Sequence, residues 1–329
     1  TETNEYYIRL IDLESKISEK LNNYEKAFKK INIRNEYTKK LKKNIYYNKN
    51  TITHTIKKYK NFYNNKNINI INKKLNYEDD SKLVFLVGFP RSGTTLLDTI
   101  LRTHSKTIVL EEQPYLLNLR HEFFKTKKNN LIGLLEITQE EKDQIRIEYL
   151  KKINMHDNLE KNIFIDKLPL SIIELGFIKC IFPNSKIITL LRHPCDVIIS
   201  CYFSSFKTNE AMINFLNWKD TINFYNDVFD LYEFYQSELD LNIYTIKYED
   251  VVYDFKNQIE KLLKFLGLRY EKNQEEFYIT AQKRTKISTP SYSQVINPLY
   301  STSIGRWKNF SNNKSAETNL IKWIDKFNY

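Results

Sequence analysis

The clearest chemistry in the sequence lies in the turn Gly88–Thr95, which follows a short apolar run and precedes a helical pattern. Its two glycines keep the Gly-x-x-x-x-Gly frame of a Walker A loop, whose backbone amides surround a phosphate. Thr94 stands where an ATPase or kinase has the lysine that reaches the β- and γ-phosphates. The turn therefore predicts a site for a phosphate-like group and argues against ATP. A tight glycine turn capped by threonine is the alternative without a function.

An anion in this turn would meet two kinds of positive charge. If a helix begins near Thr94, the first amides of that helix point at the anion and the helix dipole stabilises it. Arg91 adds a planar, permanent charge beside the same group. The backbone donors in this hypothesis belong to Ser92, Gly93, Thr94 and Thr95.

A second candidate phosphate-binding element is Leu190–Ser200, which also passes from an apolar run into a helical pattern. Arg192 would lie at the end of a strand and Ser200 two turns along the helix. An arginine and a hydroxyl in these places could share a second phosphate. Two structural alternatives remain, a simple salt bridge between Arg192 and Asp196 and a structural role for His193.

Short apolar runs position these candidates. The runs are Leu83–Val87, Ile163–Ile165, Lys186–Leu191 and Ile243–Ile246. Helical patterns separate them, at Thr95–Arg102, Leu170–Ile181 and Gln258–Leu266. This alternation predicts an α/β fold, a P-loop-like parallel sheet flanked by helices with right-handed crossovers. Because ligands bind at the carboxyl ends of such strands, we expect the candidate residues to meet at one edge of the sheet.

Residues 1–78 are predicted to form an N-terminal helical segment. Apolar side chains recur there at three- and four-residue steps, at Tyr6, Tyr7, Leu10, Ile11, Leu13, Ile17 and Leu21. The block Leu21–Phe28 resembles the second helix of a tetratricopeptide repeat, but one copy is not an array, and a plain amphipathic helical pair explains it equally well. We therefore divide the chain into residues 1–78, a candidate tetratricopeptide remnant, and residues 79–329.

The composition excludes several classes of protein and leaves others open. The 329 residues carry a formal net charge of +11, which suits an anionic ligand or an acidic partner; a solvated basic surface is the alternative. No nucleic-acid-binding module is visible, so we expect no nucleic-acid partner. The three cysteines show no Cys-x-x-Cys pair or nearby histidine at metal spacing, so we predict neither a disulfide framework nor a zinc site.

Targeting and assembly are only partly constrained by the sequence. No apolar run approaches the roughly 20 residues that cross a bilayer, and no signal peptide is visible. We therefore expect a cytoplasmic protein with no membrane segment in this chain. Because the chain begins at Thr1, upstream repeats or a targeting segment stay open. The oligomeric state is also open, with a homodimer as one option.

Several of these motifs, in the same order, resemble the sulfotransferase family, which uses 3′-phosphoadenosine-5′-phosphosulfate (PAPS). Pro90–Thr95 is similar to the family's 5′-phosphosulfate loop, and Arg192–Ser200 to its 3′-phosphate motif. Ser303–Lys308 is similar to the late Gly-x-Trp segment that closes over the nucleotide. Two further stretches fit the family pattern, Ile246–Val252 and Leu263–Leu268. The resemblance covers about residues 82–310 and is more specific than any single loop.

The resemblance implies a set of residues that bind PAPS and its product adenosine 3′,5′-bisphosphate (PAP). Of Arg306 and Lys308, which flank Trp307, only one is expected to reach the 3′-phosphate. Tyr248 would contact adenine, with a packed aromatic residue as the alternative. The implied nucleotide-binding residues are Arg91, Ser92, Gly93, Thr94, Thr95, Arg192, Ser200, Tyr248, Arg306 and Trp307.

Within the family, the chain is most similar to tetratricopeptide-linked bacterial sulfotransferases and protein-tyrosine sulfotransferases. His104–Glu112 matches their acidic segment, which puts Glu112 at the position of the catalytic base. A carboxylate there can take the proton of the acceptor hydroxyl in the transition state. Glu111 is the alternative base, because two adjacent carboxylates are expected to point to opposite sides.

The other implied catalytic residues follow from the same resemblance. Lys167, within Asp166–Pro169, matches a lysine that would stabilise or protonate the leaving 5′-phosphate oxygen. Ser291 matches a serine that faces the transferring group, and with Arg91 it would hold the sulfuryl oxygens. Because the sulfuryl group of PAPS carries a single negative charge, we predict no metal.

The expected function is sulfuryl transfer from PAPS to an acceptor hydroxyl by in-line displacement. A tyrosine on an acidic peptide is the preferred acceptor, because the chain is basic and Glu112 replaces the histidine of the cytosolic phenol sulfotransferases. A sugar or another small alcohol is the alternative acceptor. Two other classes stay open: a P-loop kinase or NTPase with Asp166 as a magnesium ligand, and a nucleotide-binding scaffold whose N-terminal helices recruit a partner.

Overall fold

The structure, a computed structural model, describes residues 2–42, 48–73, 80–154, 163–283, 295–311 and 313–329. Contacts divide the chain into two compact units. The sheet unit comprises Ile56–Leu191 and Val228–Tyr300, and the helical unit comprises Thr1–Thr55, Arg192–Asp227 and Ser301–Tyr329. The unit boundaries fall within α3 (Asn50–Phe62), within α11 (Trp218–Glu238), and in two connecting segments. The division of the chain between residues 78 and 79 stays a prediction.

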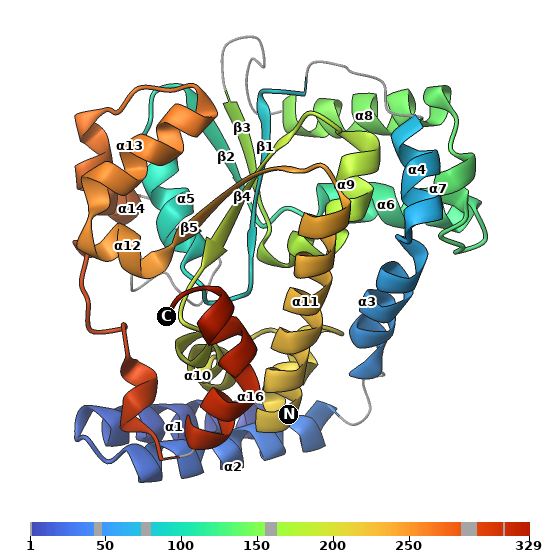
Figure 1. Ribbon diagram of the computed structural model, residues 1–329. Coiled ribbons are helices and arrows are strands. Elements are labelled where there is room, and N and C mark those ends of the chain that lie inside the picture. Colours follow the sequence, from blue (N-terminus) through green and yellow to red (C-terminus); the bar gives the residue numbers. More distant parts are fainter. Residues whose placement is uncertain (1, 43–47, 74–79, 155–162, 284–294, 312) are drawn as a thin grey trace. The chain divides into compact units, whose positions relative to one another are not determined.

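The sheet unit contains a five-stranded parallel sheet with the order β2-β3-β1-β4-β5 (Figure 1). The strands are β1 (Leu83–Gly88), β2 (Thr107–Glu111), β3 (Ile163–Lys167), β4 (Lys186–Leu191) and β5 (Asn242–Lys247). The predicted α/β fold is confirmed, and four strands lie at the predicted apolar runs. The prediction lacks β2, a short edge strand whose acidic end was assigned to a catalytic segment instead.

Helices cover both faces of this sheet. The helices that lie wholly within the sheet unit are α4 (Asn65–Lys73), α5 (Thr94–Arg102), α6 (Tyr115–Thr126), α7 (Gly133–Glu136), α8 (Gln139–Asn154), α9 (Leu175–Ile181), α12 (Tyr248–Tyr253), α13 (Phe255–Leu266) and α14 (Phe277–Lys283). Short 3₁₀ helices occupy η1 (Pro169–Glu174) and η3 (Lys272–Glu276). Figure 1 shows α5, α12, α13 and α14 on one side of the strands, and α6, α8 and α9 on the other.

The alternation of side chains along β1 explains how these two layers pack. Val84 and Leu86 join an apolar cluster with residues of α5 and α13. Phe85 points the other way and contacts the rings of Tyr149 on α8 and Phe182. Because both faces are covered, all six residues of β1 are buried, as expected for an unbroken apolar run in a parallel sheet.

The strand register brings the carboxyl ends of neighbouring strands to one edge of the sheet. Lys167, the last residue of β3, is aligned with Glu111 of β2 and with Leu86 of β1. On the other side of β1, Gly88 is aligned with Leu190 of β4. Polar residues that follow β1, β2 and β3 are therefore neighbours, although more than 70 residues separate Gly88 from Lys167 in sequence.

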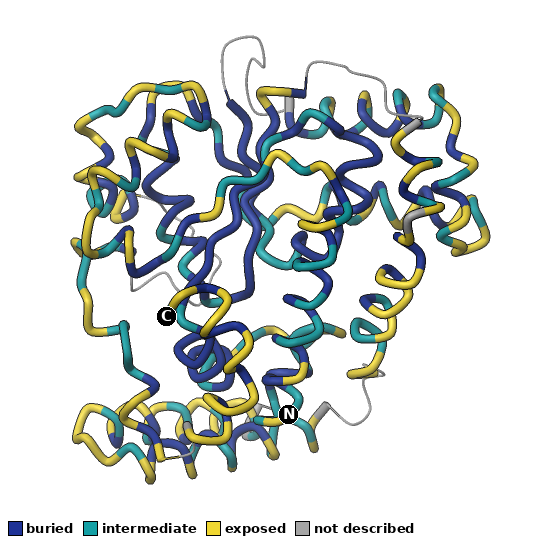
Figure 2. Tube along the Cα trace, in the orientation of Figure 1, coloured by how far each residue is buried: buried dark blue, intermediate teal, exposed yellow. Residues whose placement is uncertain are grey.

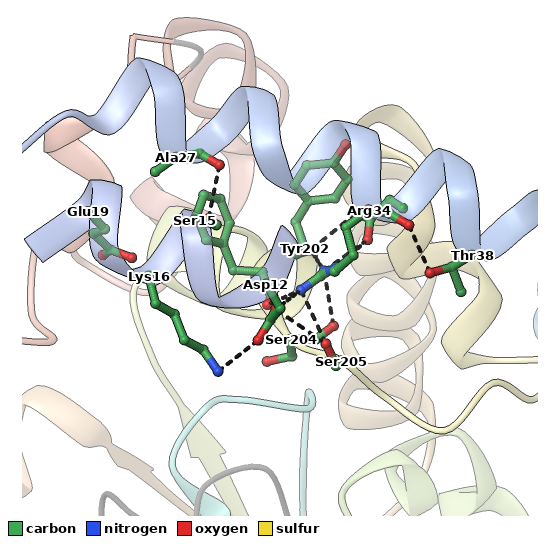
Figure 3. Close-up of polar contacts among 12 residues, drawn as sticks. Asp12, Ser15, Lys16, Glu19, Ala27, Arg34, Thr38, Tyr202, Ser204 and Ser205 are labelled. Carbon is green, nitrogen blue, oxygen red and sulfur yellow. Dashed lines mark hydrogen bonds and ion pairs between the residues drawn. The ribbon is translucent and has the colours of Figure 1, made fainter. Parts of the chain in front are cut away.

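The helical unit begins with the paired helices α1 (Glu2–Lys20) and α2 (Tyr24–Lys42). Its other elements are α10 (Pro194–Phe203), η2 (Met212–Leu216), η4 (Arg306–Asn309) and α16 (Asn313–Lys326). Figure 3 shows where α2 meets the end of α10, through the buried side chain of Arg34. The predicted N-terminal helices are confirmed for the described residues, whereas the tetratricopeptide resemblance stays a prediction.

Burial differs between the strands of the sheet and the α1–α2 hairpin (Figure 2). β1 and β3 are fully buried and β4 nearly so, β5 is half-buried to exposed over most of its length, and much of α1 and α2 is exposed. Among its described residues, the α1–α2 hairpin exposes eight large apolar side chains: Tyr6, Tyr7, Leu10, Leu13, Ile17, Leu21, Ile33 and Leu41. Ile11, by contrast, is buried. A bilayer-spanning helix, which would need a long apolar stretch, does not occur among the helices that the structure describes.

Candidate functional site

The phosphate-binding turn predicted after the first strand is formed by the connection from β1 to α5. Gly93 precedes α5 with a left-handed backbone (φ 105°), and α5 begins at Thr94 as predicted. The first amides of a helix have no acceptor within it and attract an anion. Arg91 is also left-handed, with φ 68°, which is uncommon for a residue with a side chain and is often found at functional sites.

Both glycines of this turn are required by close contacts. A Cβ atom on Gly88 would lie 2.7 Å from the carbonyl oxygen of Leu190. A Cβ atom on Gly93 would lie 2.7 Å from Cδ2 of Tyr248. The ring of Tyr248 therefore packs against the turn itself, a contact that the proposed adenine-binding role does not require.

A buried lysine lies at the carboxyl end of β3. The side chain of Lys167 is fully buried, and its Nζ atom donates a hydrogen bond to Oε1 of Glu112 at 2.9 Å. The same Nζ atom lies 3.6 Å from Oε1 of Glu111 and 3.6 Å from Oδ2 of Asp98. The amide of Glu112 also donates to the carbonyl oxygen of Lys167 at 2.8 Å. Three carboxylates thus surround one ammonium group.

The expectation that Glu111 and Glu112 point to opposite sides is wrong. Both carboxylates lie within 3.6 Å of Lys167 Nζ. The cause is the backbone at Glu112, which is left-handed with φ 49° and so ends the alternation of the preceding strand β2. Glu112 is also the more accessible of the two, with 35% of its side chain exposed against 11% for Glu111.

Asp98 is a member of this cluster that the sequence prediction missed. Its side chain is fully buried on α5, and Oδ1 accepts hydrogen bonds from Arg102 at 2.8 Å and 3.1 Å. Its other oxygen faces Lys167. A signal was present in the sequence, because Asp98 follows Leu97 on a helix whose inward residues are otherwise apolar or small. An acid at a core position of the helix after a phosphate loop is a candidate partner for a buried cation.

Asp166 lies on the opposite face of β3 from Lys167. Oδ2 of Asp166 accepts a hydrogen bond at 2.6 Å from the hydroxyl of Tyr149 on α8. Complete burial raises the pKa of this carboxyl to about 6. The carboxylate of Asp166 thus faces α8, whereas Lys167 faces α5 on the other side of the sheet. A magnesium ion beside the phosphate turn would need an oxygen on the α5 side. The structure therefore argues against Asp166 as a magnesium ligand.

In the helical unit, side chains at the start of α10 bind the backbone of the segment around Trp307. Asp196, in the first turn of α10, accepts from the amide of Gly305 at 2.7 Å and from that of Trp307 at 2.9 Å. Arg192 donates to the carbonyl oxygen of Ser303 at 2.6 Å. Both carboxylate oxygens of Asp196 therefore accept hydrogen bonds from backbone amides. A simple salt bridge with Arg192, the alternative that the sequence left open, does not describe this arrangement.

His193 has the structural role that the sequence suggested as its alternative. Its Nδ1 atom accepts from the amide of Cys195 at 3.2 Å and so caps α10. Its ring stacks on Trp307 with centroids 5.0 Å apart. Burial lowers the pKa of His193, which favours the neutral ring that this capping bond needs.

The remaining candidates of the helical unit occupy different surroundings. Ser200 is buried in the last half of α10, and Trp307 is buried as well. Arg306 forms a two-pronged ion pair with Glu19 of α1, with Nη2 at 2.8 Å from Oε2, and lies over the ring of Phe203. Lys308 Nζ lies 5.9 Å from the centre of the Trp307 ring.

Two remaining predictions concern the role of Ser291 and metal binding. Ser291 lies outside the described residues, so its role stays a prediction. Within the part of the chain that the structure describes, no group of three or more histidine, cysteine or acidic side chains is arranged to hold a metal ion.

Comparison with known proteins decides the family. The family model described as "Sulfotransferase family" matches residues 84–272, more than half of the 329 residues. This chain is a member of the sulfotransferase family. The matched region contains the phosphate turn, the Lys167 cluster, Arg192, Ser200 and Tyr248. It does not include the N-terminal hairpin or the segment around Trp307.

Two curated relatives are each less than 30% identical to this chain. This sulfotransferase-family chain is 29% identical over 237 residues to an uncharacterized protein of Aquifex aeolicus, an alignment covering 69% of this chain and 30% of that protein. It is 24% identical over 240 residues to protein-tyrosine sulfotransferase 1 of Danio rerio, covering 70% and 67% of the two chains. The chain thus spans between about a third and two thirds of the length of these relatives.

A solved structure shares the fold. The sulfotransferase domain from the Synechococcus PCC 7002 olefin synthase superimposes with a TM-score of 0.53 at 20% identity. The superposition covers 78% of this chain and 98% of that domain. The parallel sheet flanked by helices is therefore a sulfotransferase fold.

Proposed function

We propose that this chain transfers a sulfuryl group from PAPS to an acceptor hydroxyl. The observation that carries the proposal is the buried ammonium of Lys167, held by Glu112 at 2.9 Å and tied through Asp98 to the helix that follows the phosphate turn. The turn lacks the lysine of an NTPase, and a lysine from a neighbouring strand supplies a positive charge instead. Sulfotransferase family membership supports the same assignment.

We further propose that this chain holds a nucleotide with two phosphate groups. The turn from β1 to α5 offers helix amides at Gly93, Thr94 and Thr95, and a cradle in which a Cβ atom on Gly93 has no room. Arg91 would lie at the phosphosulfate end. We assign Arg192 and Ser200 to the 3′-phosphate, together with one of Arg306 and Lys308. Ser92, Tyr248 and Trp307 are assigned to the remaining nucleotide contacts.

In this mechanism PAPS supplies an activated sulfuryl group, and the chain supplies position and charge. A bond forms between the acceptor oxygen and sulfur while the bond from sulfur to the 5′-phosphate oxygen breaks. Glu112 takes the acceptor proton, and Lys167 stabilises the charge that develops on the leaving oxygen. Arg91 and Ser291 hold the sulfuryl oxygens. The contact between Glu112 and Lys167 must open for both roles; Glu112 is the partly exposed member of the pair.

A tyrosine on an acidic peptide is the acceptor that we favour, with a sugar or another small alcohol as the alternative. Protein-tyrosine sulfotransferases are among the relatives of this chain, at 24% identity. The net charge of +11 would attract an acidic peptide.

Nucleotide preference tests this proposal at its first step. Thermal unfolding would be followed with PAP, with ATP plus magnesium, and in buffer alone. A ligand at a hundred times its dissociation constant adds about 2.7 kcal/mol to the stability of the folded state, so a specific ligand gives a clear shift. We expect PAP alone to raise the unfolding temperature. Stabilisation by ATP plus magnesium with no response to PAP would overturn the proposal.

A further inference from the structure

The side chain of Arg34 is a buried cation at the end of the helix that carries Ser200. Only 2% of this side chain is exposed. Its guanidinium donates to the carbonyl oxygens of Tyr202 at 2.9 Å and Phe203 at 2.8 Å, and to Oδ1 of Asp12 at 2.6 Å (Figure 3). It therefore joins α2 and α1 to the last residues of α10.

Helix geometry explains why a cation is favourable at this place. The last carbonyl groups of a helix have no donor within it, and their dipoles attract positive charge. The planar guanidinium of Arg34 donates hydrogen bonds to the carbonyl oxygens of Tyr202 and Phe203 at the same time, a geometry that the single ammonium of lysine cannot reproduce. Ser204, which follows α10, donates its hydroxyl to the carbonyl oxygen of Ser200 at 2.7 Å and is itself contacted by Arg34 at 3.4 Å.

The same hairpin also holds the segment attached to the start of α10. Glu19 of α1 pairs with Arg306 through both carboxylate oxygens. The neighbours of Arg306 in sequence, Gly305 and Trp307, bind Asp196 in the first turn of α10 through their amides. One hairpin therefore fixes the end of α10 through α2, and the segment bound to its beginning through α1.

We propose that the α1–α2 hairpin is part of the nucleotide site, with Arg34 and Glu19 as positioning residues for its 3′-phosphate half. This inference rests on the proposed function, which assigns the 3′-phosphate to Arg192 and Ser200. Neither positioning residue needs to touch the nucleotide. Arg34 binds the last carbonyl groups of α10, the helix that carries Ser200. Glu19 binds Arg306, in the segment that is hydrogen-bonded to the start of α10. Removing either contact should therefore weaken recognition of the 3′-phosphate more than recognition of the rest of the nucleotide.

The test compares two nucleotides that differ only in the 3′-phosphate. Dissociation constants for PAP and for adenosine 5′-monophosphate would be measured by calorimetry for the full chain and for Glu19→Gln and Arg34→Lys. We expect the affinity for PAP to fall about tenfold, as for one lost hydrogen bond to a charged group, while that for the monophosphate changes less than about twofold. The ratio of the two constants is informative because a general loss of stability would leave it unchanged.

Glu14→Gln is the matched control. Glu14 of α1 pairs with Lys30 of α2 at 2.5 Å, so its removal weakens the hairpin internally without touching α10 or Arg306. It should leave both dissociation constants unchanged. Because Glu19 is partly exposed, its variant should fold even if the Arg34 variant does not.

The possible outcomes separate the two claims. If the unaltered chain binds PAP no better than the monophosphate, the proposed function fails and the inference fails with it. If the unaltered chain prefers PAP and Glu19→Gln keeps that preference, only the inference is overturned. Equal losses for both nucleotides would likewise overturn it, because they would assign the hairpin a purely structural role.

Discussion

Replacing Asp166 by asparagine should change how the stability of this chain depends on pH. Asp166 is completely buried, and Tyr149 donates its hydroxyl to Oδ2 at 2.6 Å. Among the residues that the structure describes, Oδ1 of Asp166 has no hydrogen-bond partner. Burial disfavours the charged form and raises the pKa of the carboxyl from 3.8 to about 6.

The size and sign of the effect follow from this difference in pKa. About two pKa units at 1.36 kcal/mol each correspond to about 3 kcal/mol. Between pH 4 and pH 6 the folded chain holds the proton of Asp166 more tightly than the unfolded chain does. The free energy of unfolding therefore falls as the pH rises through this window, and the loss is complete above about pH 6. Asparagine does not titrate, so the Asp166→Asn variant lacks this loss.

Denaturant unfolding at pH 4, 5, 6, 7 and 8 measures the effect. The stability of Asp166→Asn relative to the unaltered chain should improve by about 2.4 kcal/mol from pH 4 to pH 7, because part of the full change lies below pH 4. A constant cost of about 1–3 kcal/mol for burying the new amide group shifts every point equally and does not alter the slope. Tyr149→Phe is the companion variant; losing its hydrogen bond to the carboxylate should move the window to higher pH. A stability difference independent of pH would refute this reasoning.

The same variant separates two classes of function. If Asp166 were a magnesium ligand, Asp166→Asn would abolish activity. In the proposed mechanism it touches no reacting group, so sulfuryl transfer at pH 7 should stay within a few-fold of the unaltered chain.

Three further predictions concern the turn and the lysine cluster, and a glycine outside both serves as the control for the first. Gly93→Ala should destabilise the chain by about 3 kcal/mol or more and abolish PAP-induced stabilisation, because its Cβ atom would lie 2.7 Å from an aromatic ring. Gly267→Ala, also left-handed but with nothing within 4 Å, should cost only about 1–2 kcal/mol by denaturant unfolding. Glu112→Gln should keep PAP affinity in calorimetry but slow transfer by about 100-fold or more. Asp98→Asn should cost about 1–3 kcal/mol by the same unfolding assay, because Lys167 loses a buried counter-charge.

Local sequence patterns were sufficient for most of the sheet. Leu83–Val87 is apolar throughout and Lys186–Leu191 is mostly apolar, because both faces of the sheet are covered. The glycine turn after the first run indicated that a helix follows. The strand Thr107–Glu111 escaped prediction because it is short, lies at an edge and ends in an acid that a second acid follows.

The arrangement around Lys167 was beyond such patterns. Asp98 lies near Lys167 because α5 packs on the sheet with this side chain facing the end of β3. The residues next to Asp98 in sequence do not predict that orientation. Glu111 and Glu112 share one side because of the left-handed backbone of Glu112. The burial of Arg34 depends on carbonyl groups nearly 170 residues away. Each of these features is a property of packing between distant segments.

The central claim is that this chain moves a sulfuryl group from PAPS with the help of Lys167 and Glu112. The direct measurement is mass spectrometry of acidic tyrosine peptides and a pool of sugars and small alcohols, incubated with PAPS and the chain. We predict that an acceptor gains the mass of one sulfuryl group and PAP is released, and that Lys167→Met binds PAP but does not transfer. Undiminished transfer by Lys167→Met, or no sulfated product from any acceptor, would contradict the claim.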